Sequence, residues 1–179
     1  RDRRRAGALP AGRRSPVSGE FERIRKIAES LGPRAHGLGD DCAVLASGDG
    51  RLLLSTDTSV EGVHFRLDWI THREVGWRAA ASALSDLAAG GAGASGVLAA
   101  VVLPATASDQ ELVAVMDGVG DAAAASGAMV LGGDLSSGPS WAATITVAGW
   151  AVRPMTRVGA RPGDGVWVTG VLGAARAAL

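Results

Sequence analysis

Three segments of this chain carry apolar residues at helical spacing. The first spans residues 21–31 and stops at a Gly-Pro pair. The second, about residues 72–89, is rich in alanine, begins at a capping box of Thr71 with Glu74 and ends at two glycines. The third begins at another capping box at Ser108, and its apolar residues then line one helical face. The pattern predicts one short helix and two long ones.

Short apolar runs outside these helices predict the strands. The first two runs are joined by Ser47-Gly48-Asp49-Gly50, whose Asp-Gly step is typical of a tight hairpin. A short strand at 129–131 is expected to end at a Gly-Gly-Asp cluster. Together with the two long helices, these strands predict an α+β fold, in which a mixed, mostly antiparallel sheet packs against both helices. The expected strands lie at residues 42–46, 52–56, 96–103, 129–131, 141–152 and 166–170.

Composition bounds the class of protein. The length of 179 residues suits one domain with the start of a second, and 47% of the residues are apolar, as in a globular protein. No apolar span approaches the 20 uncharged residues that a membrane helix needs, so no membrane partner is expected. Arg153-Pro154 is the expected boundary. The predicted organisation is a disordered basic extension (1–18), a main domain (19–152) and the truncated start of a second domain (153–179).

The net charge of zero hides an asymmetry. Residues 1–16 hold six arginines and one aspartate, which leaves the remainder with a net charge of −5. A basic tail on an acidic body can indicate nucleic-acid binding, but this tail lacks aromatic residues and periodicity, which favours a disordered extension without a nucleic-acid partner. The single cysteine, Cys42, excludes an internal disulfide and is typical of a cytoplasmic protein.

Acidic residues stand beside glycines and hydroxyls in four separate clusters. Each cluster follows or interrupts an apolar stretch, where an unpaired carboxylate would be costly to bury. Such carboxylates, gathered in one small domain, suggest hard cations, because Mg²⁺ takes oxygen ligands and bridges protein carboxylates to substrate phosphates. The pattern therefore indicates a magnesium-dependent enzyme that handles phosphates. The clusters are Gly39-Asp40-Asp41, Ser55-Thr56-Asp57, Ser85-Asp86 and Gly132-Gly133-Asp134.

Three of the four clusters also have a plainer interpretation, and only Ser55-Thr56-Asp57 is harder to dismiss. Gly-Asp-Asp by itself is more often a solvated turn, and Gly-Gly-Asp by itself is a weak turn motif. On the predicted 72–89 helix, Trp77, Ala81, Leu84 and Ala88 share one face, and Asp86 lies almost opposite. If the helix is covered on both sides, Asp86 needs a partner such as a metal or a phosphate. A solvent-facing helix padded with alanine is the equally weighted alternative.

Two further residues could contact a substrate. His64 could orient it, although a lone histidine is more often structural, and Arg157 could clamp a phosphate, although it could equally be a surface arginine. No Walker lysine motif or dinucleotide-binding Gly-x-Gly-x-x-Gly is present, which argues against the commonest phosphate loops. Cys42 has no histidine near it in sequence, which argues against thiol nucleophile chemistry.

In this order, the segments resemble the N-terminal domain of the thiamine-monophosphate kinase family. The most specific stretch is Ser-Thr-Asp-Thr-Ser-Val-Glu-Gly-Val-His-Phe at 55–65. The wider superfamily of ATP-binding enzymes includes aminoimidazole ribonucleotide synthetase and selenophosphate synthetase, and it shares the other stretches more loosely. The resemblance runs from about residue 19 to the end of the chain. The matching stretches are 19–21, 39–44, 55–65, 84–89, 132–134 and 157–164.

The resemblance implies transfer of the ATP γ-phosphoryl group to thiamine monophosphate, with ATP as co-substrate, several Mg²⁺ ions and an aminoimidazole ribonucleotide synthetase-like fold. It makes residues 19–152 the ATP- and Mg²⁺-binding domain, implies a homodimer formed through the sheets, and leaves no residue as general acid or base. His64 matches a substrate contact, and Gly133, Asp134 and Arg157 match ATP contacts. The implied magnesium-binding positions are Asp41, Ser55, Thr56, Asp57, Asp86 and Asp134.

Two departures and two alternatives accompany this resemblance. Gly90 and Ala94 stand where the family usually has a methionine and a nearby proline, which predicts a looser turn after the second helix. The chain also ends before most of the family's second domain, so this fragment by itself is expected to be inactive. One alternative function is another ATP-dependent synthetase of the same superfamily. The other is a metal-stabilised dimerisation module without catalysis.

Overall fold

A computed structural model describes residues 20–34, 40–170 and 172–173 of the chain. The chain divides into two units, residues 1–39 and residues 40–179. The first unit holds helix α1 (Glu20–Leu31) and a short 3-10 turn η1 (Gly32–Arg34), as the sequence predicts. The arginine-rich extension, Gly39 and the last six residues lie outside the described residues. None of the described helices is long and apolar enough to cross a membrane.

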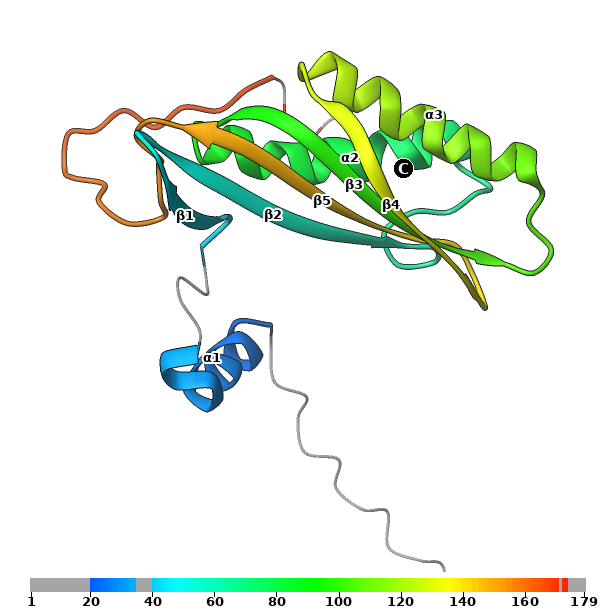
Figure 1. Ribbon diagram of the computed structural model, residues 1–179, viewed down its shortest axis with the longest axis horizontal. Helices are drawn as coiled ribbons and strands as arrows, with labels where there is room; N and C mark the ends of the chain where they lie inside the picture. Colours follow the sequence, from blue (N-terminus) through cyan, green and yellow to red (C-terminus); the bar gives the residue numbers. More distant parts are fainter. Residues whose placement is uncertain (1–19, 35–39, 171, 174–179) are drawn as a thin grey trace, which may run out of the picture. The chain divides into compact units, whose positions relative to one another are not determined.

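The second unit is built on one five-stranded sheet (Figure 1). The strands lie in the order β1-β2-β5-β3-β4, and all neighbours are antiparallel except β3 and β4, which are parallel. The mixed, mostly antiparallel sheet predicted from the sequence is therefore confirmed. The strands are β1 (Ala43–Ser47), β2 (Gly50–Val60), β3 (Gly93–Pro104), β4 (Met129–Gly138) and β5 (Ala142–Ala151).

The β1–β2 hairpin follows directly from its turn residues. Ser47 pairs with Gly50, so the turn consists of Gly48 and Asp49, and Gly48 takes a φ of 53° that favours glycine. The hairpin register then places Ala43 opposite Leu54. Residues 55–60 of β2 extend beyond β1 and pair only with β5, which leaves this part of β2 near the edge of the sheet.

Two long helices pack on one face of the sheet, as Figure 1 shows. Helix α2 (His72–Ala89) packs on the central strands, and α3 (Asp109–Ala125) packs on β3 and β4. Both predicted capping boxes are present, so each helix begins where its sequence predicts. The core between sheet and helices is fully buried at Leu53, Leu87, Val97, Ile145 and Val147.

The structure corrects two predicted strands. The strand at 129–131 does not end at Gly132-Gly133-Asp134; β4 continues through that cluster to Gly138 because β3 offers it a parallel partner along its whole length. The predicted strand at 166–170 is absent, and these residues have no regular structure. The side chains of Val166 and Trp167 are 95% and 91% exposed, so no neighbouring strand covers them in the described chain.

The predicted packing of α2 is also wrong in part. Trp77 is 44% exposed, and the buried stripe instead includes Val75, Ala79, Ala83 and Leu87. Helix α2 is covered on two adjacent sides, by the sheet and by α3, and not on opposite sides. Asp86 lies at the border of the buried stripe and is partly buried.

The turn after α2 is not loose. The backbone amides of Gly90, Gly91 and Ala92 all donate to carbonyls in the last turn of α2, at 2.8–3.0 Å. Gly90 is buried, and a Cβ at this position would lie 2.5 Å from the Leu53 side chain. The end of the Leu53 side chain therefore packs where a larger residue at position 90 would place its Cβ, and it would have to shift to admit one.

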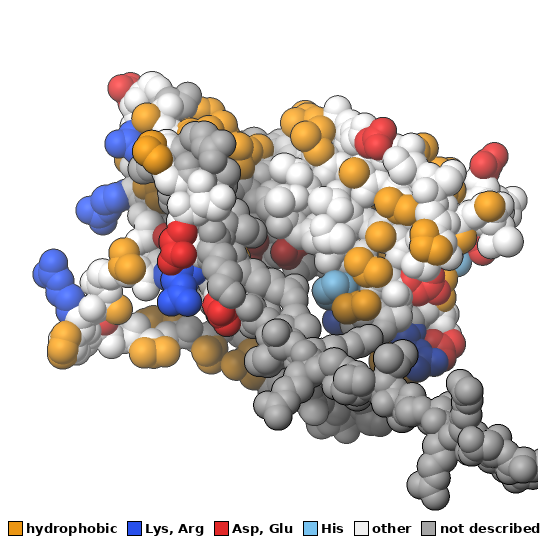
Figure 2. All heavy atoms as spheres, turned by 90° about the horizontal axis from the view of Figure 1, so that it is seen from below, with side chains coloured by type: hydrophobic (Ala, Val, Ile, Leu, Met, Phe, Trp, Pro, Cys, Tyr) orange, Lys and Arg blue, Asp and Glu red, His pale blue; other side chains and the backbone are white. Residues whose placement is uncertain are grey.

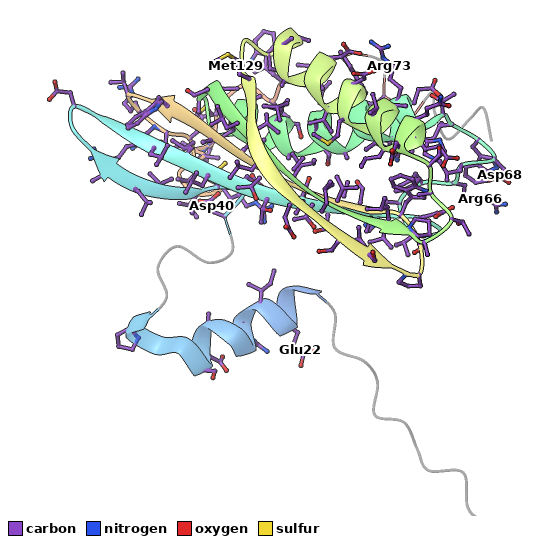
Figure 3. The ribbon with its side chains drawn as sticks, turned by 45° about the vertical axis from the view of Figure 1, so that its right-hand side comes forward. Glu22, Asp40, Arg66, Asp68, Arg73 and Met129 are labelled. Atoms are coloured by element: carbon purple, nitrogen blue, oxygen red, sulfur yellow. The ribbon has the colours of Figure 1, made fainter. Side chains whose placement is uncertain are left out.

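Exposed ion pairs lie on the surface of this unit. Arg66 pairs with Asp68 in the loop before α2, and Arg73 of α2 pairs with Asp121 of α3 (Figure 3). Figure 2 shows acidic and basic side chains interspersed over the face it displays. Because these pairs are solvent-exposed, each contributes little to stability, and burial of the apolar core dominates.

Helices α2 and α3 approach closely through two glycines. A Cβ on Gly76 would lie 1.9 Å from the carbonyl oxygen of Val115, and a Cβ on Gly118 would lie 1.9 Å from that of Arg73. Both distances are far below van der Waals contact, so neither position accepts a side chain unless the helices separate. This contact fixes α2, which carries part of the candidate site described below.

We predict that Gly118→Ala destabilises the protein by about 3 kcal/mol, because the added methyl group forces α2 and α3 apart. Gly120→Ala is the matched control on the same helix, since a Cβ there meets nothing within 4 Å. That substitution should leave stability unchanged or raise it by about 0.5–1 kcal/mol. Urea denaturation of both variants gives the comparison. Equal stability of the two variants would contradict the glycine contact.

Candidate functional site

Two hydrogen bonds join β2 to α2 at the acidic clusters. The Ser55 hydroxyl donates to Asp86 Oδ2 at 2.5 Å, and the Ser82 hydroxyl donates to Asp57 Oδ2 at 2.7 Å. Each bond links a strand residue to a helix residue, and in each a serine orients a carboxylate. Because successive strand residues point to opposite faces, Ser55 and Asp57 share the face that α2 covers.

The middle residue of the Ser-Thr-Asp cluster points the other way. The Thr56 hydroxyl shares a hydrogen bond of 3.0 Å with Thr146 on β5, and Thr58 makes the equivalent bond of 2.9 Å with Thr144. These threonines lie on the sheet face away from the helices, as the alternation of β2 requires. The cluster therefore does not present its three side chains to one ligand.

Asp86 carries the most informative titration shift in the site. Burial raises the pKa of this carboxyl above its ordinary value, and the negative charges of Asp57 and Asp41 raise it further. The hydrogen bond from Ser55 and the charge of Arg157 oppose this shift. Asp41 and Asp57 are thus each close enough to Asp86 to repel its charge, although the three residues come from three separate segments.

Arg157 binds the first acidic cluster. Its guanidinium donates twice to Asp41 Oδ1, once from Nε at 3.1 Å, and its backbone amide donates to Asp40 Oδ1 at 3.3 Å. Asp41 raises the pKa of Arg157, with smaller contributions from Asp40 and Asp86. The segment that follows β5 therefore returns to the acidic cluster and places a positive charge there.

Cys42 lies beneath the same cluster. Its Sγ lies 3.4 Å from the carbonyl oxygen of Asp86, and the side chain is buried. Burial raises the pKa of Cys42 to about 11, and the carboxylates of Asp86, Asp41 and Asp40 add to the effect. The thiol is therefore protonated at neutral pH, and this environment is the opposite of the electropositive one that activates a nucleophilic cysteine.

Asp134 does not join the other three carboxylates. The register runs from Asp57 through Ile145 and Ala99 to Gly133, so three strand spacings, about 14 Å, separate β2 from β4. Asp134 itself pairs with Ala100 and accepts a hydrogen bond from Ser136 at 3.2 Å. Gly133 and Asp134 instead line a cavity of about 560 Å³ between β4 and α3.

The donor set suits a hard cation but does not complete a site. Asp41, Asp57 and Asp86 offer only oxygen, as Mg²⁺ prefers. Among the described residues, no three carboxylate, histidine or cysteine side chains gather closely enough to hold one ion. Any cation held here therefore takes the rest of its shell from phosphate, water or other residues.

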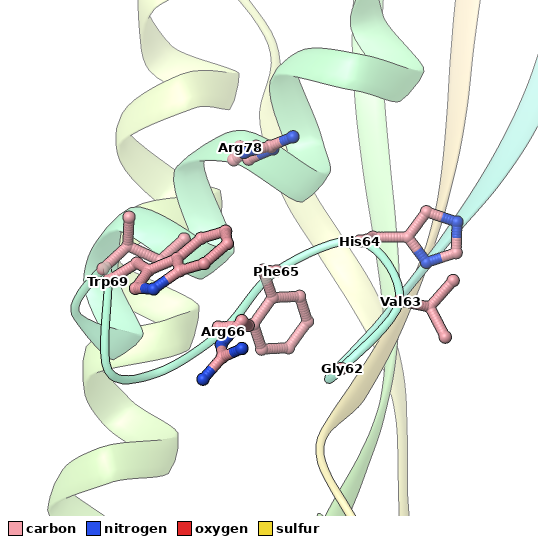
Figure 4. A pocket seen from close by; sticks show the side chains of 8 residues that line it. Gly62, Val63, His64, Phe65, Arg66, Trp69 and Arg78 are labelled. Carbon is pink, nitrogen blue, oxygen red and sulfur yellow. The ribbon is translucent and has the colours of Figure 1, made fainter. Parts of the chain in front are cut away.

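A second cavity, of about 430 Å³, lies beside the loop between β2 and α2 (Figure 4). Phe65 and Trp69 provide aromatic walls, and Arg66, which lies 4.8 Å from the Trp69 ring centroid, and Arg78 provide positive charge. His64 also lines this cavity, and its Nδ1 accepts a hydrogen bond from the Val60 amide at 3.0 Å. The cavity thus combines apolar rings with cationic groups.

Helix α2 connects this cavity to the carboxylates. Arg78, Ser82 and Asp86 are spaced four residues apart, so they follow one line along the helix, about 12 Å long. Sequence analysis identified Asp86 but missed the other two, although their spacing from Asp86 was a usable signal. Trp69 carried no such signal, because only the folded loop brings it to the cavity.

Comparison with known proteins places this chain in a family. Residues 39–152 match the model of the AIR synthase related protein, N-terminal domain. The chain belongs to this family. It is 38% identical over 160 residues to the thiamine-monophosphate kinase of Mycobacterium tuberculosis, covering 87% of this chain and 48% of that protein. It is 34% identical over 174 residues to the thiamine-monophosphate kinase of Escherichia coli (strain K12), covering 96% of this chain and 52% of that protein.

A solved structure agrees with these matches. It is described as AaThiL complexed with AMPPCP and TMP, and it superposes with a TM-score of 0.77 at 32% identity. The superposition covers 82% of this chain and 46% of that one. The predicted resemblance and the aminoimidazole ribonucleotide synthetase-like fold are therefore confirmed. The chain spans about half the length of the relatives that it matches.

We predict that Asp86→Asn stabilises the protein at pH 7 in the absence of divalent cations. The folded-state pKa of Asp86 is raised, so its charged form destabilises the fold at neutral pH. The wild type recovers this stability as the pH falls through the raised pKa toward the ordinary value of 3.8, so the advantage of the variant should shrink there.

Urea denaturation with EDTA at pH 7 and at pH 4 measures this difference. Asp49→Asn, in the exposed turn of the β1–β2 hairpin, is the control and should not alter stability at either pH. A variant at position 86 that is less stable than the wild type at pH 7 would contradict the described environment of this carboxyl.

Proposed function

We propose that the full-length protein transfers the γ-phosphoryl group of ATP to thiamine monophosphate. The observation that carries this proposal is the convergence of Asp41, Asp57 and Asp86 from three segments. One face of α2 connects these carboxylates to the cavity lined by aromatic and cationic side chains. The relatives support it, since they are named thiamine-monophosphate kinases and a solved one is complexed with AMPPCP and TMP.

Magnesium is the cation that these residues fit. Three partly repelling carboxylates, without nitrogen or sulfur ligands, match the donor preference of Mg²⁺, and their repulsion is relieved when a divalent cation binds. We assign Asp41, Asp57 and Asp86 as carboxylate ligands shared among several Mg²⁺ ions, and Ser55 as the residue that orients Asp86. When bound, Mg²⁺ ions supply neutralisation of the phosphate charge. Thr56 and Asp134 are also magnesium positions by the resemblance. The Thr56 hydroxyl lies on the opposite face of the sheet and Asp134 lies on β4, so their side chains are not assigned to the ions held by Asp41, Asp57 and Asp86.

The protein's own residues supply positioning. Phosphoryl transfer needs in-line alignment and charge neutralisation, with little covalent chemistry from the enzyme. Ser55 and Ser82 hold two carboxylates in fixed orientations, which keeps the arrangement ordered before substrate arrives. Arg157 offers a planar fork of donors to a phosphate. No general base is assigned, because the acceptor phosphate is already ionised.

Two cavities are assigned to the two substrates. The cavity of Phe65, Trp69 and His64 suits thiamine monophosphate, because aromatic walls stack with flat heterocycles and favour a cationic ring. Arg78 lines this cavity and lies on the face of α2 that leads to the carboxylates. Its positive charge directs the phosphate of thiamine monophosphate toward them. The cavity of Gly133 and Asp134 is assigned to ATP, since Leu112 and Met116 offer apolar contact to a base.

We also propose that the protein is a homodimer joined through the open face of its sheet. On β2 and β5 this face presents Thr56, Thr58, Thr144 and Thr146, and Leu98 of β3 beside them is 45% exposed. The part of this face formed by β2, β5 and β3 carries no charged side chain, which is typical of an interface with a second copy. A monomeric mass in sedimentation equilibrium would contradict this assembly.

The location proposed is the cytoplasm. Cys42 is the single cysteine, it is buried, and it forms no disulfide within the chain. A described chain without a disulfide is compatible with a reducing compartment. An export signal in the full-length sequence would contradict this location.

We predict that Asp57→Asn lowers turnover of thiamine monophosphate by roughly a hundredfold or more in the full-length protein. The substitution removes a negative charge but leaves an oxygen for the Ser82 hydrogen bond, so the fold should persist. ADP release measures turnover, and circular dichroism checks the fold. Asp117→Asn, at an exposed position of α3, is the control and should retain full activity. Near-normal turnover of the Asp57 variant would exclude the proposed role.

We predict that Trp69→Ala raises the KM for thiamine monophosphate about tenfold and leaves the KM for ATP unchanged, because it removes one wall of the acceptor cavity. Trp77→Ala removes an exposed tryptophan of α2 outside that cavity and should alter neither constant. Steady-state kinetics with each substrate varied in turn separates the two effects. A change in the ATP constant alone would reverse the assignment of the cavities.

A further inference from the structure

Arg157 makes an unusual set of contacts for a proposed phosphate ligand. Two guanidinium nitrogens donate to the same oxygen of Asp41, and the backbone amide of Arg157 donates to Asp40. The residue proposed to hold ATP thus occupies an oxygen of a residue proposed to hold Mg²⁺. That oxygen cannot accept both donors and ligate a cation in the same geometry.

The segment that carries Arg157 is fastened at two points. The Met155 amide donates to the carbonyl of Gly90 at 3.0 Å, which ties the segment to the end of α2. Two residues later, Arg157 ties it to the acidic cluster. Residues 156–163 are exposed and have no helix or strand. A segment with few buried contacts opens at low free-energy cost, so the Arg157 contact can exchange while the Gly90 anchor keeps the arginine nearby.

Charge explains why the contact forms. The guanidinium of Arg157 forms an ion pair with Asp41 and its backbone amide donates to Asp40, so a positive charge is held against two adjacent carboxylates. In return, Asp41, Asp40 and Asp86 all raise the pKa of Arg157. The guanidinium therefore neutralises part of the cluster in the protein described here.

We propose that Arg157 is an exchangeable counter-ion, which occupies the carboxylate of Asp41 until the cation and the nucleotide bind. When they bind, the guanidinium leaves Asp41 and its fork of donors turns to the nucleotide phosphates, which match its geometry. The arginine thus competes with the cation for Asp41 and cooperates with it once a phosphate is present. This inference rests on the proposed function, because it assumes a site for cation and nucleotide together.

The proposal predicts effects of opposite sign for one substitution. In full-length Arg157→Ala, Mn²⁺ alone should bind roughly fivefold more tightly, because its competitor is absent. AMPPCP in the presence of saturating Mn²⁺ should bind roughly tenfold more weakly, because the phosphate contact is lost. Isothermal titration calorimetry measures both affinities. A merely structural role for Arg157 would weaken both.

Two further variants sharpen the test. Arg157→Lys keeps the charge but loses the planar fork, so its Mn²⁺ affinity should stay within twofold of the wild type while its AMPPCP affinity falls. Arg161→Ala, in the same exposed segment, should alter neither affinity. Weaker Mn²⁺ binding in Arg157→Ala, or unchanged AMPPCP binding, would overturn the exchange but leave the proposed function intact. A wild type that binds neither probe would overturn both proposals.

Discussion

The candidate site requires that carboxylates of like charge are held close together at the border of the core. Two serine hydroxyls, one on β2 and one on α2, each fix a carboxylate of the opposite element. The bonds cross between strand and helix, so they set the alignment of α2 on the sheet as well as the orientation of Asp57 and Asp86. Everything proposed for this site requires that alignment, because the two carboxylates are 29 residues apart in the sequence.

This arrangement lowers stability locally, and the rest of the fold offsets the cost. Asp86 has a raised pKa because its charge is partly buried among other negative charges. The offset comes from the apolar core under the central strands and from the glycine contact that fixes α2 against α3. A charge cluster of this kind on a rigid support is typical of a functional site, since a bound cation relieves the repulsion.

The sequence predicted those parts of the fold that depend on a single local motif. The glycine-rich segment 47–50 predicted the β1–β2 hairpin, although its turn is Gly48-Asp49 and not the Asp49-Gly50 step, and the capping boxes placed the starts of α2 and α3. These features depend on neighbouring residues only. The predicted packing of α2 was wrong in part because its contact with α3 depends on Gly76 and Gly118, which lie far apart in sequence. The end of β4 was wrong because a distant parallel partner, β3, overrides the turn tendency of Gly132-Gly133.

The same reasoning applies to the site. Asp41, Asp57 and Asp86 could be predicted to converge from their positions beside apolar segments, and the spacing of Ser82 from Asp86 on α2 was a usable signal. Trp69 could not be predicted, since only the folded loop before α2 brings it to the cavity. Strand alternation separates the hydroxyl of Thr56 from those of its neighbours, and it was available from the sequence. Asp134 shows the limit of such reasoning, because only the order of the strands reveals how far it lies from the other clusters.

The most direct test of the account is anomalous diffraction from crystals of the full-length protein with Mn²⁺ and AMPPCP. Manganese takes the oxygen ligands of magnesium and marks its own position. The account predicts anomalous peaks within coordination distance, roughly 2.0–2.4 Å, of carboxylate oxygens of Asp41, Asp57 and Asp86. Ordered nucleotide with manganese bound elsewhere, and these three carboxylates without a cation, would contradict it.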